Sequence, residues 1–412
     1  MSLGLVWIDA TQPAAGWRLW GMNLVERQVR QAALRGFSQA RVWVSPASRE
    51  SVQRLRPDFA RLYPLRLEFS LAERPGQPGS DLEQADCPVV LLAGDTVWDE
   101  RLLAHLLERG PGTAVVEGAE AVAFLRPEQA CSVGRVRSGC LGATLTARAA
   151  ALGVQLCRPA DLDPYVPSLR LQMPPYLVRV KDTGQLRSLD RLLYHRTFKG
   201  VIDAVARYGY YHLVRWITRH LSRTALPPDL FTLLSLAGIW GAIPLLALGH
   251  LGAGAVVAWL GVILDSVDGK LARLTLHLNE GMGRLEHLAA MPGLGLWYAA
   301  LGWHCTAGAL LDWGPMALAT WGLLAAFVAD KAVSGAFKAR HGRELFDYRP
   351  MDAAFHLVAS RRNISLLLLS GGALLDQARL ALALMAGWMG FTLLFHGGRW
   401  LWVEIEKKTR RD

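Results

Sequence analysis

Residues 251–275, LGAGAVVAWLGVILDSVDGKLARLT, decide how the rest of the chain is interpreted. The run 251–264 carries no charge, and Asp265, Asp268, Lys270 and Arg273 then follow within nine residues. Charge at the end of a membrane-length apolar run is costly and is therefore a candidate for function. Asp265 and Asp268 are three residues apart, so both carboxylates lie on one face of a helix and can point at one cation. A helix end at the membrane surface would explain the two basic residues, but not two aspartates and Gly269 together.

Further apolar runs of similar length lie on both sides of this stretch. They cover 230–249, 251–274, 285–310, 313–330, 359–375 and 379–397. Of the 412 residues, 52% are hydrophobic and only 19% are charged. Such a composition, collected into long runs, excludes a disordered, collagen-like or purely soluble protein. The C-terminal half is therefore expected to be an all-α transmembrane domain of six helices, over 225–412.

Basic residues gather in alternate connections between these runs. They are Lys270, Arg273 and Arg284, then Lys331, Lys338, Arg340, Arg343, Arg349, Arg361 and Arg362, and finally Lys407, Lys408, Arg410 and Arg411. Cytoplasmic loops of membrane proteins carry such an excess. We therefore expect a multi-pass protein of the plasma (inner) membrane with its N- and C-termini in the cytoplasm. The net charge of +10 has the same origin, so the membrane is expected as a partner and nucleic acid is not.

The first 193 residues alternate short apolar strands with helical patterns. Strands are predicted at 3–8, 40–44 and 89–93, and helices at 24–34 and 101–107. This alternation predicts a parallel sheet covered by helices, in an α/β, Rossmann-like cytoplasmic domain. The segment 75–86, rich in Gly, Pro and acidic residues, is expected to be a surface loop.

Residues 194–224 form a basic and aromatic linker. They carry Arg196, Lys199, Arg207, Arg215, Arg219 and Arg223 among Tyr208, Tyr210, Tyr211 and Trp216. The pattern favours an amphipathic helix that lies at the headgroup level of an anionic leaflet. A solvated helix that merely joins two domains is the alternative.

The charged end of 251–275 also carries a resemblance. DxxDGxxAR, here Asp265 to Arg273, resembles the first half of the signature of the CDP-alcohol phosphotransferases, whose six spans and preceding amphipathic helix are similar to this layout. In that family GxxxDxxxD follows on the third span. Here Gly283 is in place, but His287 and Met291 stand at the two aspartate positions. Pro228 to Thr232 is similar to the family's PNxxT, and Arg361-Arg362-Asn363 to its basic-Asn element.

The N-terminal part resembles a sugar-nucleotidyltransferase domain. The matching segments are 21–28, 91–95 with Asp95 as the metal-binding position, and 182–186 as the late DTPxDL element. The Gly-rich phosphate loop is reduced to Ala14-Ala15-Gly16-Trp17-Arg18-Leu19, and no lysine follows before Lys181. Backbone N–H groups in such a loop normally cradle the phosphates. The combination of domains is similar to that of the bifunctional inositol-1-phosphate cytidylyltransferase/di-inositol-phosphate-phosphate synthases.

The resemblance implies a membrane transferase that moves a substituted phosphate from a CDP-alcohol to an alcohol or lipid acceptor and releases CMP. It implies a divalent cation, Mg or Mn, with Asp265, Asp268 and His287 as ligands, unless these replacements have altered or removed the metal site. Gly269, Ala272, Arg273 and Gly283 are the expected nucleotide-binding positions, and the family often forms homodimers.

His287 is a candidate for two different roles. An imidazole is an indifferent ligand for magnesium and a better one for manganese or zinc. It is also a candidate catalytic base, since its unperturbed pKa lies near neutrality, whereas the thioether of Met291 accepts no proton. One hypothesis is therefore a transferase with an altered site, and another is a non-catalytic relative that acts as a binding or scaffold partner. A transporter is a third, although the charges cluster at one helix end and not at the midplane.

Overall fold

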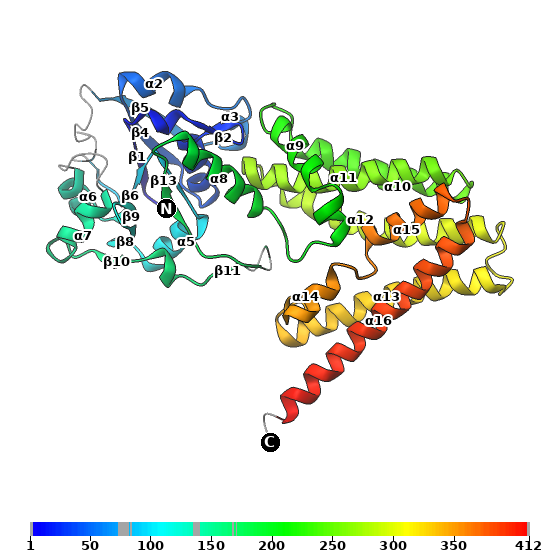
Figure 1. The fold of residues 1–412 in the computed structure, drawn as a ribbon. Helices are drawn as coiled ribbons and strands as arrows, with labels where there is room; N and C mark the ends of the chain where they lie inside the picture. Colours follow the sequence, from blue (N-terminus) through cyan, green and yellow to red (C-terminus); the bar gives the residue numbers. More distant parts are fainter. Residues whose placement is uncertain are drawn as a thin grey trace.

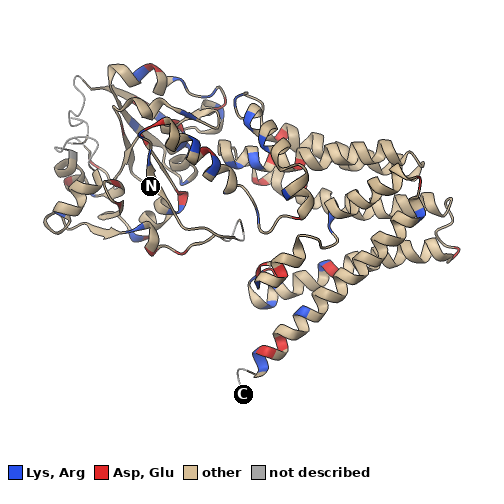
Figure 2. Cartoon of the chain, viewed as in Figure 1, with Lys and Arg blue, Asp and Glu red and all other residues tan. Residues whose placement is uncertain are grey.

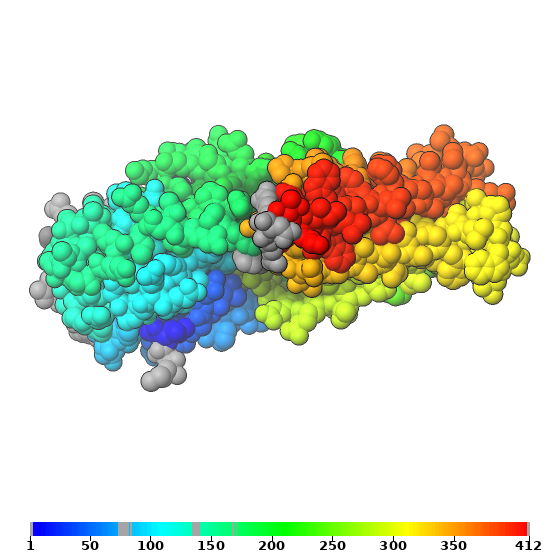
Figure 3. Space-filling model, turned by 90° about the horizontal axis from the view of Figure 1, so that it is seen from below, coloured from blue at the N-terminus to red at the C-terminus, as the bar shows by residue number. Residues whose placement is uncertain are grey.

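The computed structural model describes residues 3–72, 82, 85–134, 141–166, 169 and 171–409. It consists of an N-terminal α/β domain and a C-terminal helical region that lie end to end (Figure 1), so that the molecule is elongated (Figure 3). The surface loop expected at 75–86 lies largely outside the described residues.

A seven-stranded mixed sheet forms the centre of the α/β domain, in the order β10-β8-β9-β6-β1-β4-β5. Its strands are β1 (Leu5–Ala10), β4 (Gln39–Val44), β5 (Arg66–Leu71), β6 (Val89–Ala93), β8 (Thr113–Glu117), β9 (Glu120–Leu125) and β10 (Gln155–Cys157). The predicted strands at 3–8, 40–44 and 89–93 correspond to β1, β4 and β6, which pair in parallel. The expected all-parallel sheet is wrong for β9, which is antiparallel to both β6 and β8. Only two residues join β8 to β9, and so short a connection can join only antiparallel strands.

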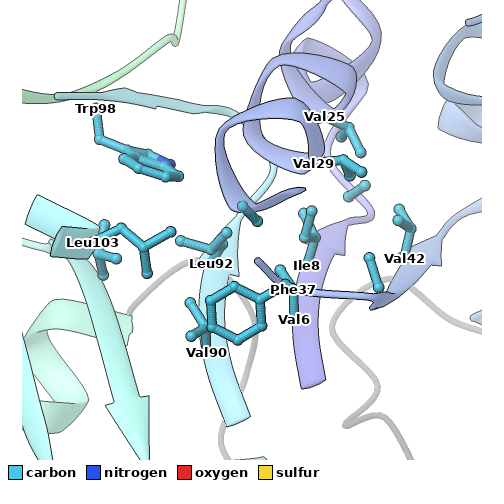
Figure 4. Close-up of a cluster of buried hydrophobic side chains, with 14 of the residues drawn as sticks. Val6, Ile8, Val25, Val29, Phe37, Val42, Val90, Leu92, Trp98 and Leu103 are labelled. Carbon is cyan, nitrogen blue, oxygen red and sulfur yellow. The ribbon is translucent and has the colours of Figure 1, made fainter. Parts of the chain in front are cut away.

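Helices cover both faces of this sheet. The α/β domain also contains α1 (Leu24–Leu34), α2 (Pro46–Gln53), α3 (Phe59–Leu62), α5 (Glu100–Arg109), α6 (Pro127–Gly134), α7 (Leu141–Leu152), α8 (Thr183–His195), the 3-10 turns η1 (Pro13–Gly16) and η2 (Pro159–Asp161), and the short strands β2 (Arg18–Leu19), β3 (Met22–Asn23), β7 (Thr96–Trp98), β11 (Tyr165–Val166), β12 (Leu171–Gln172) and β13 (Leu177–Arg179). Figure 4 shows alternate residues of the central strands packed against α1 and α5. Because the remaining strand residues are buried on the opposite face, the first four residues of β1, Leu5 to Ile8, form a continuous apolar run.

Eight helices make up most of the C-terminal region. They are α9 (Tyr211–Leu221), α10 (Pro228–Ala247), α11 (Leu251–Thr275), α12 (Glu280–Cys305), α13 (Pro315–His341), α14 (Pro350–His356), α15 (Arg362–Leu374) and α16 (Ala378–Thr409), with a π-helical turn η3 (Val205–Gly209) before α9 and a 3-10 turn η4 (Leu345–Asp347) before α14. Figure 2 shows few charged residues along α10 to α13 and α15, except toward the ends nearest the α/β domain.

Four of the described helices, α10, α11, α13 and α16, are long and apolar enough to cross a membrane. Helices also occupy the other two predicted spans. However, α15 has 13 residues and is therefore about 20 Å long, shorter than a hydrocarbon core of about 30 Å. The count of six spans stays a prediction.

The pair α10 and α11 approaches closely at two glycines. A Cβ added at Gly238 would lie 2.8 Å from the Cα of Gly261, so that a larger residue would force the helices apart. Small residues at such crossings let the backbones of membrane helices touch. This contact fixes α11 laterally, and α11 carries the charged segment 265–273.

The α/β domain holds the C-terminal end of α11. Arg27 and Arg30 of α1 donate hydrogen bonds to the carbonyls of Leu274 (2.6 Å) and Thr275 (3.1 Å), and the Tyr63 hydroxyl donates to the carbonyl of Leu276. The last carbonyls of a helix have no partner within the helix and lie at the negative end of its dipole. Two guanidinium groups therefore cap α11 and connect the two parts of the molecule.

Candidate functional site

The two aspartates of α11 lie in different surroundings. Asp268 is buried, with 2% of its surface exposed, and its Oδ2 has no hydrogen-bond partner among the described residues. Asp265 is half-buried and accepts a charged hydrogen bond from Arg362, at the start of α15. Asp268 thus keeps one unpartnered oxygen, since its Oδ1 accepts from the Gly269 N–H, whereas Asp265 already has a cationic partner.

A cavity of about 270 Å³ lies beside Asp265. Its polar lining comes from six elements or connections: Asp203, Asp265, Glu286, His287, Lys331, Ser360, Arg361, Arg362 and Asn363. The structure therefore brings His287 and Met291, which also lines the cavity, to the side of Asp265. Asp268 is not among the lining residues, so the expected set of Asp265, Asp268 and His287 does not face one cavity.

A second cavity of about 250 Å³ shares Asp265, Glu286, Arg362 and other residues with the first. It is also lined by Gly269, Lys270 and Arg273, three residues of the signature-like segment. A Cβ at Gly269 would lie 3.1 Å from a terminal nitrogen of Arg273, so the glycine makes room for that guanidinium group.

Two other predicted nucleotide-binding positions lie outside the linings of these two cavities. Ala272 is half-buried in α11. Gly283 is exposed near the start of α12, and a Cβ added there would meet no atom within 4 Å. No packing contact within the described chain therefore requires glycine at position 283.

A polar network joins the segment before α9 to the start of α15. The sequence indicated only some of its residues. The Asn363 side-chain nitrogen donates to Asp203 (2.7 Å) and to the Tyr210 hydroxyl (2.8 Å). The resemblance singled out Asn363 and Arg362, but nothing in the sequence marked Asp203. This network holds the first turn of α15 in place and so orients Arg362 toward Asp265.

Lys331 of α13 brings a further cation to the first cavity. Its ammonium lies 3.7 Å from the carboxylate of Asp330, which accepts at 2.6 Å from His396 of α16. In the sequence, Lys331 was only one of the basic residues that indicated the topology. With Arg361 and Arg362, Lys331 gives the cavity three cations beside three carboxylates, a lining that suits a ligand carrying negative charge.

His356, in the short helix α14, orients Arg361. The guanidinium donates to the His356 Nε2 at 2.6 Å. Burial, together with the nearby charge of Arg361, lowers the pKa of His356 to about 2. The imidazole is therefore neutral at physiological pH and can accept this hydrogen bond.

The described residues fit a cation only in part. The unpartnered buried oxygen of Asp268 is a suitable hard ligand, and Asp265 lies three residues away on the same helix. Arg362 competes for Asp265, and no group of three His, Cys, Asp or Glu side chains within the described ranges is arranged to hold a metal ion. A cation bound by both aspartates would have to displace the guanidinium of Arg362.

The segment that corresponds to the Gly-rich loop does not form an open phosphate loop. The segment that replaces the Gly-rich loop is the turn η1, in which the N–H groups of Ala15 and Trp17 donate to the carbonyls of Gln12 and Ala14. These N–H groups are used internally and cannot bind phosphate in this conformation.

Two further nucleotidyltransferase-like positions have structural partners. Asp95 is buried, and Arg179 of β13 donates to its Oδ2 at 2.7 Å. Asp182 caps α8 by accepting from the Gln185 N–H at 2.8 Å. Helix capping and an ion pair thus account for both aspartates without a nucleotide.

Comparison with known proteins gives partial matches. No family model matches the chain. Phosphatidylinositol phosphate synthase of Mycobacterium tuberculosis is 39% identical over 70 residues, which are 17% of this chain and 32% of that protein. The enzyme of the same name from Mycobacterium marinum is 31% identical over 106 residues, 24% of this chain and 45% of that protein. The chain thus spans a third to less than half of the length of these relatives.

A solved structure of the M. tuberculosis phosphatidylinositol phosphate synthase with CDP-DAG bound is 23% identical. The match covers 46% of this chain and 94% of that one, with a TM-score of 0.36. This score is too low to support an argument from structure.

Proposed function

We propose that the chain is a membrane transferase that moves a substituted phosphate from a CDP-alcohol to an alcohol acceptor, with release of CMP. The observation that carries this proposal is the pair Asp265 and Asp268 at the charged end of α11, with Asp265 facing a cavity lined by both cations and carboxylates. The partial sequence matches to phosphatidylinositol phosphate synthases support it.

The side chains at the cavity have separate tasks in this proposal. A divalent cation held by Asp265 and Asp268, with His287 as a further candidate ligand, would neutralise the charge of the donor's pyrophosphate. Arg361, Arg362 and Lys331 bind and orient phosphate oxygens, since guanidinium and ammonium groups form charge-assisted hydrogen bonds with them.

Proton removal from the acceptor alcohol falls to His287 or Glu286. Both line the same cavity as Asp265, and Met291, at the position of the family's last aspartate, accepts no proton. The two roles of His287, ligand and base, exclude each other at any one moment, because a metal-bound nitrogen has no free lone pair. Gly269, Ala272, Arg273 and Gly283 are proposed to face the nucleotide.

An acceptor that itself carries a phosphate group is favoured. Lys331 lines the first cavity and not the second, whereas Lys270 and Arg273 line the second and not the first. A cationic subsite separate from the donor's pyrophosphate suits such a molecule, and the relatives' name points in the same direction.

The remaining parts of the proposal concern arrangement. Residues 1–193 form a domain without nucleotidyl transfer activity, 194–224 lie at the membrane interface, and 225–412 cross the plasma membrane with both termini in the cytoplasm. A homodimer is the expected assembly. A non-catalytic binding or scaffold role is the second candidate, favoured by the pairing of Asp265 with Arg362 and by Met291.

The test is CMP formation by the full-length protein in liposomes, with CDP-diacylglycerol, Mn²⁺ or Mg²⁺, and inositol phosphate or glycerol 3-phosphate as acceptor. Wild-type protein should form CMP only when an acceptor is present. Asp268→Asn should abolish both CMP formation and binding of CDP-diacylglycerol, because one remaining carboxylate leaves too little charge to hold a cation.

Asp376→Asn is the matched control. It removes an exposed carboxylate between α15 and α16, and asparagine tolerates the φ of +53° found there. Its activity should equal that of wild type. If wild-type protein neither binds the donor nor forms CMP with either acceptor, the transferase proposal fails and the scaffold role is preferred.

A further inference from the structure

A third cavity, of about 330 Å³, lies between the α/β domain and the helical region. Its lining includes Arg27, Gln31 and the start of α5 from one side, and Arg273, Leu274 and Leu276 from the other. Neither part of the chain encloses it alone. Its volume falls within the range of small-molecule sites, and apolar residues such as Leu169 and Met173 supply part of the wall.

Cations outnumber carboxylates in this lining. The cations are Arg27, Arg101, Arg196, Lys199 and Arg273, and the carboxylates are Asp99 and Glu100. Asp99 is already used, because it accepts from Arg101 at 2.8 Å and from Arg196 at 2.7 Å. Arg27 and Arg273 are therefore the guanidinium groups of this lining that do not pair with Asp99.

Arg27 is the most informative of these residues. It is 95% buried, since only 5% of its surface is exposed. One terminal nitrogen of Arg27 donates to the carbonyl of Leu274, whereas the Nε of Arg27 has no hydrogen-bond partner. In the described part of the chain, Arg27 forms no ion pair with a carboxylate. Burial lowers the pKa of Arg27 to about 10, so it remains charged at neutral pH. A buried charge without a counter-charge is costly.

Arg273 repeats the pattern from the other side of the cavity. Its Nε is also buried without a hydrogen-bond partner among the described residues. Two guanidinium side chains, from two different parts of the chain, thus line one small space. Planar guanidinium groups bind phosphate oxygens in pairs of parallel hydrogen bonds, which makes phosphate the best-matched anion.

We propose that this interdomain cavity is a second binding site, which holds a phosphate group between Arg27 and Arg273. The ligand is a small phosphomonoester or inorganic phosphate. The site shares Arg273 with the second cavity beside Asp265, but Arg27 lines neither of the cavities beside Asp265. This inference does not rest on the proposed transferase function. It requires only that the two domains remain docked as the hydrogen bonds from α1 to the end of α11 show.

The experiment is equilibrium dialysis of the full-length protein in detergent micelles against radiolabelled glycerol 3-phosphate and inorganic phosphate, at low ionic strength and with EDTA. EDTA removes any cation from the membrane site. Saturable binding that depends on Arg27 is expected, and unlabelled glycerol should not compete. Tighter binding of glycerol 3-phosphate identifies a phosphomonoester as the ligand, and equal binding identifies phosphate alone.

Arg27→Gln should weaken binding by about tenfold or more, as expected for loss of charge-assisted hydrogen bonds. Arg56→Gln is the matched control. Arg56 is equally buried at the domain junction and donates to the carbonyls of Ser222 and Thr224, but it does not line the cavity. Binding to this variant should match wild type.

Three results would overturn the proposal. The first is the absence of saturable binding by wild-type protein. The second is an equal loss in Arg27→Gln and Arg56→Gln, which would show that only domain docking matters. The third is binding that survives Arg27→Gln and disappears in Lys331→Gln, which would place the phosphate in the membrane cavity. Failure of the transferase assay would leave all three readouts unchanged.

Discussion

Arg362 of α15 donates a charged hydrogen bond to Asp265 of α11, so that a guanidinium group occupies one of the two carboxylates expected to hold a cation. The sequence places these residues 97 positions apart. The Arg362 guanidinium therefore competes with a metal ion for Asp265, and the strength of this competition can be measured.

Arg362→Gln should raise the affinity for Mn²⁺ by about tenfold, because removal of one charged hydrogen bond frees Asp265. Titration followed by electron paramagnetic resonance measures this affinity directly. CMP formation should fall in the same variant, since the guanidinium would no longer bind the donor's phosphate. Arg361→Gln, which loses the bond to His356, should change Mn²⁺ affinity less. A drop in Mn²⁺ affinity for Arg362→Gln would refute the competition.

Aspartate introduced at positions 287 and 291 tests how His287 and Met291 affect activity. His287→Asp with Met291→Asp returns a carboxylate ligand and a general base to the cavity beside Asp265. Turnover should rise. The upper limit is the roughly hundred- to ten-thousand-fold that general-base catalysis contributes. The rate of CMP release is the measurement. An active wild type that loses activity on this double change would show that His287 has its own role as ligand or base.

The α/β domain should not transfer nucleotides. Full-length protein incubated with CTP and a polyol phosphate is expected to release no pyrophosphate, because Arg179 neutralises Asp95 and the turn η1 uses its own N–H groups. A coupled pyrophosphate assay measures this. Release that disappears in Asp95→Ala would contradict the prediction, whereas release that persists in this variant would point to a contaminating enzyme.

His356 should make the protein less stable in mild acid. The pKa of this buried imidazole is lowered to about 2, whereas a histidine in the unfolded chain titrates near 6.5. Between these values the unfolded chain binds a proton that the folded chain does not, so stability falls as the pH drops below about 6.5. The slope is at most about 1.4 kcal/mol per pH unit.

His356→Gln keeps an acceptor for Arg361 but cannot titrate. Its melting temperature should therefore fall less than that of wild type between pH 7 and pH 5. The exposed His212 serves as the control, and His212→Gln should retain the wild-type slope. Identical slopes for wild type and His356→Gln would rule out His356 as the source of acid sensitivity.

Single cysteines, in a background in which the native cysteines are replaced by serine, test the number of spans. If all six helices cross the membrane, Gly314→Cys and Leu375→Cys should react with an impermeant maleimide from the side opposite to Arg343→Cys. Leu375 follows the short helix α15 and is exposed. Labelling of positions 314 and 343 from the same side would exclude the six-span arrangement.

Several features of this protein could be predicted from sequence because they depend on local patterns. Apolar periodicity located β1, β4, β6 and α1, since burial on both faces of a central strand leaves a continuous apolar run. Run length located the helices of the C-terminal region. Residues three apart lie on the same side of any α-helix, so the spacing of Asp265 and Asp268 by itself placed both on one face of α11.

Other features depend on contacts between distant residues. No local pattern shows that Asp203 bonds to Asn363, or that Arg362 reaches Asp265 while Oδ2 of Asp268 is buried without a partner among the described residues. The antiparallel orientation of β9 was missed for a different reason: no strands were predicted at 113–117 and 120–125, although the two-residue connection between them is a local feature.

The sequence by itself thus determined an α/β half, an apolar helical half and a charged segment at 265–273, since side-chain hydrophobicity and helical spacing act locally. The tertiary structure alone decided that Arg27 and Arg30 cap the end of α11, and that cations from three helices or connections surround Asp265. The physical reason is that buried charges and helix-end carbonyls must find partners in space. Which residue supplies the partner depends on how the helices and the sheet pack, and not on distance along the chain.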